Sequence, residues 1–204
     1  MQDGINSNAN IAFNSNYNNY TYMYYTNSQA KTQLESWYQT NIGSKKDLAS
    51  SVASGAYYCE QAKAKYDDSW TSGSATMTTY SKYTPDFKCS SDGNNKGVVN
   101  ASVGLLTYDE VVYAGGYPYQ NNSNYYLNNP AIYWWTMSPA GYASGSSNVW
   151  RVNATGDING SGVNNTRAVR PVLILNADTL VTGSGTSSDP VSYTHLTLPT
   201  TPYV

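Results

Sequence analysis

The residues that could do acid–base or metal chemistry are few in this chain of 204 residues. It holds one histidine, His195, and two cysteines, Cys59 and Cys89. Two cysteines without a nearby histidine or a second close pair cannot complete a tetrahedral zinc shell. A calcium loop is not predicted either, because Thr166 stands where the bidentate carboxylate after the run Asp157-Ile158-Asn159-Gly160 would be needed. We interpret that run as a turn, and we predict no metal and no other cofactor.

Two groups of carboxylates could in principle supply the acid and the base of a glycosidase. Glu60 precedes Asp67 and Asp68, and Asp109 adjoins Glu110. Proximity in sequence does not set two carboxylates at the required separation across a cleft. The second pair also has a structural explanation, because acidic residues favour the first turn of a helix. We therefore predict no catalytic residue and a protein that is not an enzyme.

Cys59 and Cys89 are predicted to form a disulfide. The chain between them, residues 60–88, has few apolar anchors, and on the chain-entropy model a crosslink would stabilise it by roughly 3–4 kcal/mol. A disulfide implies an oxidising compartment. Two reduced, buried cysteines in a cytosolic protein are the alternative.

The composition indicates a binding surface without strong charge. The chain has 21 Tyr, 5 Trp and 16 Gly, only 12% charged residues, and 11 basic against 13 acidic residues, for a net charge of −2. Such a chain cannot neutralise a phosphate backbone, so nucleic acids and anionic membrane surfaces are excluded as partners. No apolar run approaches the ~20 residues needed to cross a bilayer, so membrane insertion is not predicted.

The sequence predicts helices in the first part of the chain and strands in the last part, and these elements would position the cysteines and carboxylates named above. Apolar residues at helical spacing predict an amphipathic helix over Ser28–Thr40, and a shorter helix is proposed within Lys45–Ser54. Thr107-Tyr108-Asp109-Glu110 has the pattern of a capping box, which predicts a helix that begins there and ends near Gly115.

Strands are predicted at 149–152, before a turn at 154–157, and at 169–175. Pro171 lies inside the last run and cannot donate to a ladder, so this strand should be at an edge or carry a bulge. Early helices, late strands and long polar loops indicate an α+β domain.

The two ends of the chain differ from its centre. Residues 1–27 are rich in Asn and Tyr and are interpreted as a linker or an edge strand, with Met1 internal to a longer secreted chain. Residues 28–190 form the predicted domain. The remainder, 191–204, is interpreted as a non-native tail, because Val191–Thr200 reads like a translated sequencing adapter. A natural Thr-rich tail is the alternative; without the tail the chain has no histidine, which excludes histidine-based triads.

The most specific motifs lie in the last third. They are Tyr133-Trp134-Trp135-Thr136-Met137-Ser138-Pro139, then Val149-Trp150-Arg151-Val152 with Gly156 after it, and finally Val169-Arg170-Pro171-Val172. In this order they resemble an uncharacterised family of bacterial extracellular domains with a C-type-lectin-like fold. That family is distantly similar to formylglycine-generating enzymes and to the variable proteins of diversity-generating retroelements. The resemblance covers Leu34–Pro190, although Ala168 stands where relatives usually have Gly.

The resemblance implies two short helices, a small and mainly antiparallel sheet, and long polar loops. It does not carry over the formylglycine-generating activity, which depends on cysteines in the C-terminal half, because none follows Cys89. The triplets Glu-Pro-Asn and Trp-Asn-Asp of calcium-dependent lectins are absent as well. Calcium-dependent sugar binding is therefore not expected.

Aromatic rings and Asn amides of the C-terminal half are the predicted ligand-binding face, because rings stack on sugars or peptides and amides both donate and accept hydrogen bonds. The candidates are Tyr133, Trp135, Tyr142, Asn148, Trp150, Asn153, Asn164 and Asn165. Strand alternation lets only one of Trp134 and Trp135 face a given side, so at least one should be core.

We thus predict an extracellular or cell-surface bacterial recognition module that binds an uncharged ligand, either a glycan or a protein. A structural spacer of a bacterial surface protein, with no ligand of its own, is the alternative. A polysaccharide hydrolase is a third interpretation, and it would require a cleft with two opposed carboxylates.

Overall fold

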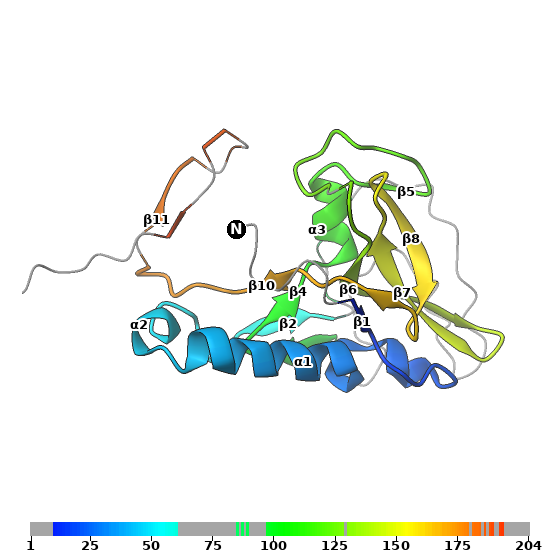
Figure 1. Cartoon of the computed structure of the whole chain (residues 1–204), viewed down its shortest axis with the longest axis horizontal. Coiled ribbons are helices and arrows are strands. Elements are labelled where there is room, and N and C mark those ends of the chain that lie inside the picture. Colours follow the sequence, from blue (N-terminus) through cyan, green and yellow to red (C-terminus); the bar gives the residue numbers. More distant parts are fainter. Residues whose placement is uncertain are drawn as a thin grey trace, which may run out of the picture.

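The chain folds into an α+β structure in a computed structural model. The residues that it describes are 10–60, 85, 87, 89, 97–128, 130–179, 181–184, 186, 188–189 and 192–193. The described structure consists of helices, short strand pairs and one larger sheet (Figure 1). Within these residues no helix is long and apolar enough to cross a bilayer.

A sheet of four strands positions the C-terminal half. Its order is β5–β8–β7–β6, where β8 pairs antiparallel with β7 and β7 with β6, while β5 pairs parallel with β8. The strands are β5 (Tyr117–Pro118), β6 (Trp134–Ala143), β7 (Ser146–Val152) and β8 (Asp157–Gly162). The run at 157–160 is thus part of a strand and not the turn that the sequence suggested.

Local backbone chemistry explains the hairpin of β6 and β7. Ser144 and Gly145 have φ of 51° and 75°, and positive φ at both central residues is typical of the tight turns that match the twist of paired strands. The register of the two strands shifts on either side of Pro139. A proline lacks the N–H that a ladder needs, so it lies where the pairing is irregular.

Helix α1 (Gln29–Tyr38) begins where the sequence predicted it. The Ser28 hydroxyl accepts a hydrogen bond from the Lys31 N–H at 3.0 Å, which satisfies one donor of the first turn. The helix continues into a π-helical turn, η3 (Gln39–Gly43), and then α2 (Lys46–Ala49). The second predicted helix is therefore only four residues long.

The capping box at helix α3 (Tyr108–Tyr113) is confirmed. The Thr107 side chain accepts from the Glu110 N–H at 3.2 Å, and the Glu110 carboxylate accepts from the Thr107 N–H at 2.7 Å. Ser138 of β6 adds a third bond, because its hydroxyl accepts from the Tyr108 N–H at 2.9 Å. This bond ties the start of the helix to the sheet.

Four pairs of very short strands complete the described structure. All are antiparallel, and they are β1 (Ile11–Ala12) with β9 (Thr166–Arg167), β2 (Tyr57–Cys59) with β3 (Val98–Asn100), β4 (Gly104–Leu105) with β10 (Pro171–Val172), and β11 (Val181–Thr182) with β12 (Ser192–Tyr193). Pro171 lies in a two-stranded pair, where both strands are edges, as its missing N–H requires.

The Asn- and Tyr-rich segment before α1 is not a linker over its described residues, 10–27. Phe13, Met23 and Tyr25 are fully buried, and the segment forms two 3-10 turns, η1 (Tyr20–Met23) and η2 (Tyr25–Asn27). A few large apolar side chains, irregularly spaced among asparagines, anchor it without a helix or strand periodicity. The alternative prediction, an edge strand, fits Ile11–Ala12, which form β1 and pair with β9. The irregular spacing of the rest explains why the sequence pattern also suggested a linker.

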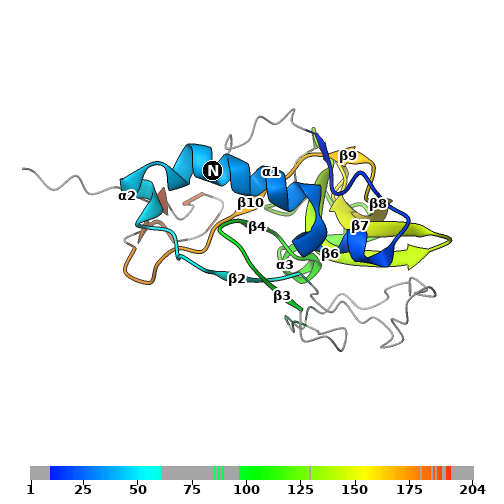
Figure 2. The same cartoon turned by 90° about the horizontal axis from the view of Figure 1, so that it is seen from below.

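Both faces of the four-stranded sheet are buried. Trp135, Met137 and Val149 belong to one core cluster with α1 and the segment before it, and Trp134 and Trp150 belong to a second cluster with α3. Figure 1 shows α1 and the preceding turns below the sheet and α3 above α1, and Figure 2 gives the same arrangement from below. The β6 and β7 strands of this mixed sheet therefore have no solvated face over these positions.

The buried phenol of Tyr25 makes the fold sensitive to alkali. Its hydroxyl donates to the Val103 carbonyl at 2.9 Å, and burial, reinforced by the charge of Glu35, raises its pKa above the ordinary 10.0. Between pH 10 and that raised value the unfolded chain releases a proton that the folded chain keeps, so stability falls as pH rises. We expect the free energy of unfolding to fall by about 1.4 kcal/mol per pH unit from this group.

Urea unfolding of the wild type and of Tyr25→Phe at several pH values between 9 and 12 would test this expectation. The Phe variant loses the hydrogen bond and should be less stable at pH 9. Its stability should then fall less steeply above pH 10, because one titrating group is missing. Parallel curves for the two proteins would contradict the assignment.

Candidate functional site

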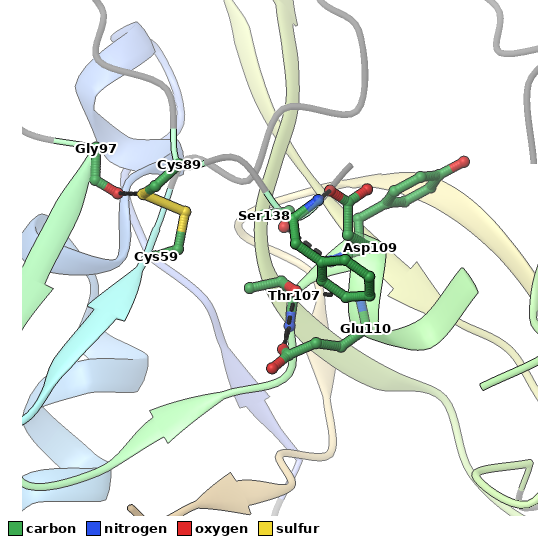
Figure 3. The surroundings of a disulfide bond; sticks show 9 residues. Cys59, Cys89, Gly97, Thr107, Asp109, Glu110 and Ser138 are labelled. Atoms are coloured by element: carbon green, nitrogen blue, oxygen red, sulfur yellow. Dashed lines mark hydrogen bonds between the residues drawn. A yellow bond between two sulfur atoms is a disulfide. The ribbon is translucent and has the colours of Figure 1, made fainter. Parts of the chain in front are cut away.

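The predicted disulfide is confirmed. Cys59, at the end of β2, is bonded to Cys89, with their Cα atoms 5.5 Å apart, a distance typical of disulfides. Figure 3 shows the bond together with Thr107, Asp109 and Glu110 at the start of α3. The crosslink fixes Cys89 against the edge of the β2–β3 pair.

Two of the predicted ligand-binding residues, Trp135 and Trp150, are core residues instead. Both are 0% exposed. The Trp135 indole N–H donates to the Ile11 carbonyl at 3.0 Å, and the Trp150 ring lies 5.0 Å from the ring of Tyr108. Because helices and loops cover both faces of the sheet, alternation places each ring in a core and not on a surface.

Three more candidates have structural hydrogen bonds. The side-chain amide oxygen (Oδ1) of Asn153 accepts from the N–H groups of Thr155 and Asp157 at 2.9 and 3.1 Å and so closes the turn before β8. The Tyr142 hydroxyl donates to the Asn18 carbonyl at 3.0 Å, and the Asn148 amide donates to the Ser146 carbonyl at 3.2 Å. Asn153 and Tyr142 thus hold the backbone of loops, and Asn148 makes a bond within β7.

The last three candidates remain at the surface. Tyr133 is 46% exposed, and Asn164 and Asn165 are exposed after β8. The Asn165 amide donates to the Ser161 hydroxyl at 3.3 Å. The structure therefore does not assemble the eight predicted residues into one face.

A concave site lies instead beside the disulfide. It is a pocket of about 190 Å³ between the β2 strand, the β4–β10 pair and the start of α3. Its lining residues are Tyr57, Tyr58, Cys59, Phe87, Leu105, Thr107, Asp109, Glu110, Met137, Val172 and Ile174. None of them was among the predicted ligand-binding residues.

The pocket has exposed aromatic residues at its mouth and an apolar floor. Tyr57 is 69% exposed, Phe87 is 55% exposed and Ile174 is 39% exposed, whereas Leu105 and Met137 are buried. Exposed rings next to a hollow are available to contact an apolar ring face of a ligand. Several exposed aromatic residues around a pocket indicate a binding site, whereas a single exposed apolar residue does not.

The polar lining of the pocket consists of two carboxylates, the Thr107 hydroxyl and the phenols of Tyr57 and Tyr58. Asp109 is only 2% exposed, and its carboxylate accepts from the Phe87 N–H at 3.2 Å. The Glu110 carboxylate accepts from both the N–H and the hydroxyl of Thr107, at 2.7 and 2.8 Å. No lysine, arginine or histidine is among the described lining residues. Such a lining favours ligands that donate hydrogen bonds and disfavours anions.

The backbone at Phe87 is strained. Its φ is 53°, a left-handed conformation that is uncommon for a non-glycine residue. The bond to Asp109 and an edge-to-face contact with Tyr113, with ring centroids 5.4 Å apart, hold it there. A strained backbone conformation persists only where the surrounding structure holds it, and such conformations are concentrated at functional sites.

Residues 6–177 match a family described as "Domain of unknown function (DUF6273)". The chain belongs to this family. No curated protein and no solved structure matches the chain. The matched range of the DUF6273 domain includes the buried segment before α1, in agreement with its place in the core.

Of the residues that the sequence offered for catalysis outside the pocket, only Glu60 is among those that the structure describes. Glu60 is 3% exposed, and its carboxylate accepts from the N–H and hydroxyl of Thr26 at 2.7 and 2.8 Å. Asp67, Asp68 and His195 lie outside the described residues. In the described part of the chain no group of three metal-ligating side chains is found.

Sequence reasoning missed the pocket because its lining comes from five separated stretches. One signal was present, since Tyr57-Tyr58-Cys59 places an aromatic pair directly before a predicted disulfide. The capping box was another, but it explained Asp109 and Glu110 without reference to a ligand. Only the folded chain shows that these features share one hollow.

Proposed function

We propose that this domain is a non-enzymatic recognition module that binds an uncharged ligand, and that the ligand is a glycan with one sugar ring in the pocket beside the disulfide. The observation that carries the proposal is the combination of exposed Tyr57 and Phe87 with acceptor side chains in one hollow. Aromatic rings pack on the apolar faces of sugars, and acceptors receive bonds from sugar hydroxyls.

The volume of the pocket supports the proposal that it holds a single sugar ring. Its volume of about 190 Å³ is below the roughly 300–1,000 Å³ of sites for drug-sized molecules. The rest of a glycan would then lie across the exposed rims of Tyr57 and Ile174. Both carboxylates of the pocket already accept bonds from the protein, which favours binding over acid–base catalysis.

The fold and the location are part of the same proposal. Flanking helices, a small mainly antiparallel sheet and long loops support a C-type-lectin-like arrangement of this domain. The Cys59–Cys89 bond supports an oxidising environment. We propose an extracellular or cell-surface site on a bacterium.

Binding of the full chain to an array of neutral and acidic glycans, under oxidising conditions, tests the proposal. We expect neutral glycans to bind and Tyr57→Ala to weaken their affinity by about tenfold or more, because truncation of a central aromatic contact commonly costs over 1 kcal/mol. Tyr126→Ala is the matched control, since Tyr126 is 66% exposed and does not line the pocket.

Two outcomes would contradict this function. If a folded wild-type chain binds no glycan, the spacer interpretation replaces recognition by this pocket. If glycans bind but Tyr57→Ala and Phe87→Ala leave the affinity unchanged, the pocket is not the site. Circular dichroism of each variant shows whether a loss reflects binding or folding.

A further inference from the structure

Two arginines gather around one exposed tyrosine, away from the pocket residues. The Cζ atoms of Arg151 and Arg167 lie 5.0 and 5.6 Å from the centre of the Tyr133 ring. Arg151 comes from β7 and Arg167 from β9, and Tyr133 directly precedes β6. Three separate segments therefore converge on this cluster, which shares no residue with the pocket.

The positive charge of the cluster is not balanced by the described protein. Burial lowers the pKa of Arg167, and the charge of Arg151 lowers it further, with only Tyr133 acting in the opposite direction. Asp157 is the carboxylate that interacts with Arg151, and burial raises its own pKa. One carboxylate cannot offset two guanidinium charges, so an excess positive charge remains.

The guanidinium groups also keep unused donors. Each carries five N–H bonds in a planar fork. Arg167 donates to the Thr166 carbonyl at 2.7 Å and to the Ser161 hydroxyl at 3.4 Å. Among the described residues, neither Nη1 of Arg151 nor Nε of Arg167 has a hydrogen-bond partner. Both of these atoms are buried, so a ligand would have to meet the other N–H groups of the two forks.

Arg170 of the same chain, by contrast, has a structural role. Its guanidinium lies 4.5 Å from the Trp134 ring centre and donates to the Leu127 carbonyl. It packs alone on a buried ring. Arg167 also lies over a buried ring, with its Cζ 6.0 Å from the Trp135 ring centre, but it shares with Arg151 the Tyr133 ring, which is 46% exposed.

We propose that Tyr133, Arg151 and Arg167 form a binding site for an oxyanion, the carboxylate or phosphate group of a small ligand. Guanidinium forks match the geometry of both groups and form the stronger, charge-assisted hydrogen bonds with them. The exposed Tyr133 ring contacts the organic part of the ligand. This site goes beyond the proposed function, because it takes an anion that the acidic pocket disfavours.

Titration of the full chain at low ionic strength with sodium glucuronate, and separately with inorganic phosphate, tests the site by calorimetry and by NMR. We expect saturable binding of at least one anion and shifts of the Tyr133 ring resonances. Arg151→Gln and Arg167→Gln should each weaken binding by roughly tenfold or more, because each removes a charge-assisted donor fork. Glucose should not bind here, since it has the sugar ring without the charge.

Lys46→Gln is the matched control, because it removes the same charge from exposed α2 and should leave binding unchanged. Binding of glucuronate alone identifies a carboxylate ligand, and binding of phosphate alone identifies a phosphate ligand. Absence of both from the folded wild type overturns the site, whether or not the variants fold. Equal losses in Lys46→Gln would overturn it as well, because they would show a non-specific charge effect.

Discussion

Replacement of Trp135 by alanine is expected to lower the free energy of unfolding by about 3–5 kcal/mol, the cost of truncating a large buried aromatic. The ring is 0% exposed and packs edge-to-face on Phe13, with ring centroids 5.8 Å apart. The variant also loses the bond from its indole to the Ile11 carbonyl, which holds β1 against the sheet. A domain with 5–15 kcal/mol of total stability would be left marginal.

Urea unfolding followed by circular dichroism measures this loss. Tyr126→Ala removes another aromatic ring, but one that is 66% exposed, and it should change stability by less than about 0.5 kcal/mol. If Trp135→Ala proved as stable as this control, the ring would not be in the core. A loss of ligand binding by the Trp135 variant would follow from unfolding and not from a lost contact.

Removal of the disulfide is also expected to lower the free energy of unfolding strongly. The Cys59–Cys89 bond closes a separation of 30 residues, and on the chain-entropy model its loss costs roughly 3–4 kcal/mol. The double variant Cys59→Ser/Cys89→Ser should therefore unfold at a clearly lower urea concentration. Because Phe87 is two residues from Cys89, we also expect the variant to bind pocket ligands more weakly.

Reduction provides the internal control for this prediction. Dithiothreitol should shift the unfolding midpoint of the wild type toward that of the double variant and should leave the double variant unchanged. A wild-type midpoint that does not respond to reduction would contradict the stabilising role of the crosslink. The comparison also separates the effect of the crosslink on stability from the effect of replacing two side chains.

Features built from neighbouring residues could be predicted from the sequence. The capping box at Thr107 and Glu110 joins residues three apart, so the spacing alone determines its geometry. The start of α1 at Ser28 and the edge position of Pro171 follow in the same way from one side chain and one missing N–H. The disulfide was predicted because the only two cysteines enclose a segment with few apolar anchors.

The placement of aromatic rings was decided by tertiary structure. Alternation predicts that Trp134 and Trp135 face opposite sides of β6, but it does not say which sides are covered. The cover on the Trp135 side includes Ile11 and Phe13, and the Trp135–Ile11 bond joins residues 124 positions apart. No local pattern encodes such a contact, so the sequence could not distinguish a ligand-binding ring from a core ring.

The two candidate sites have the same origin. The pocket collects side chains from β2, β4, α3, β6 and β10, and the arginine cluster collects them from β7, β9 and the residue before β6. The helix starts and the crosslink could be predicted from the residues alone, because they depend on bonds within a few residues or on a unique pair. Which tyrosines and arginines meet at a surface could not be predicted, because that depends on how distant segments cover one another in the folded chain.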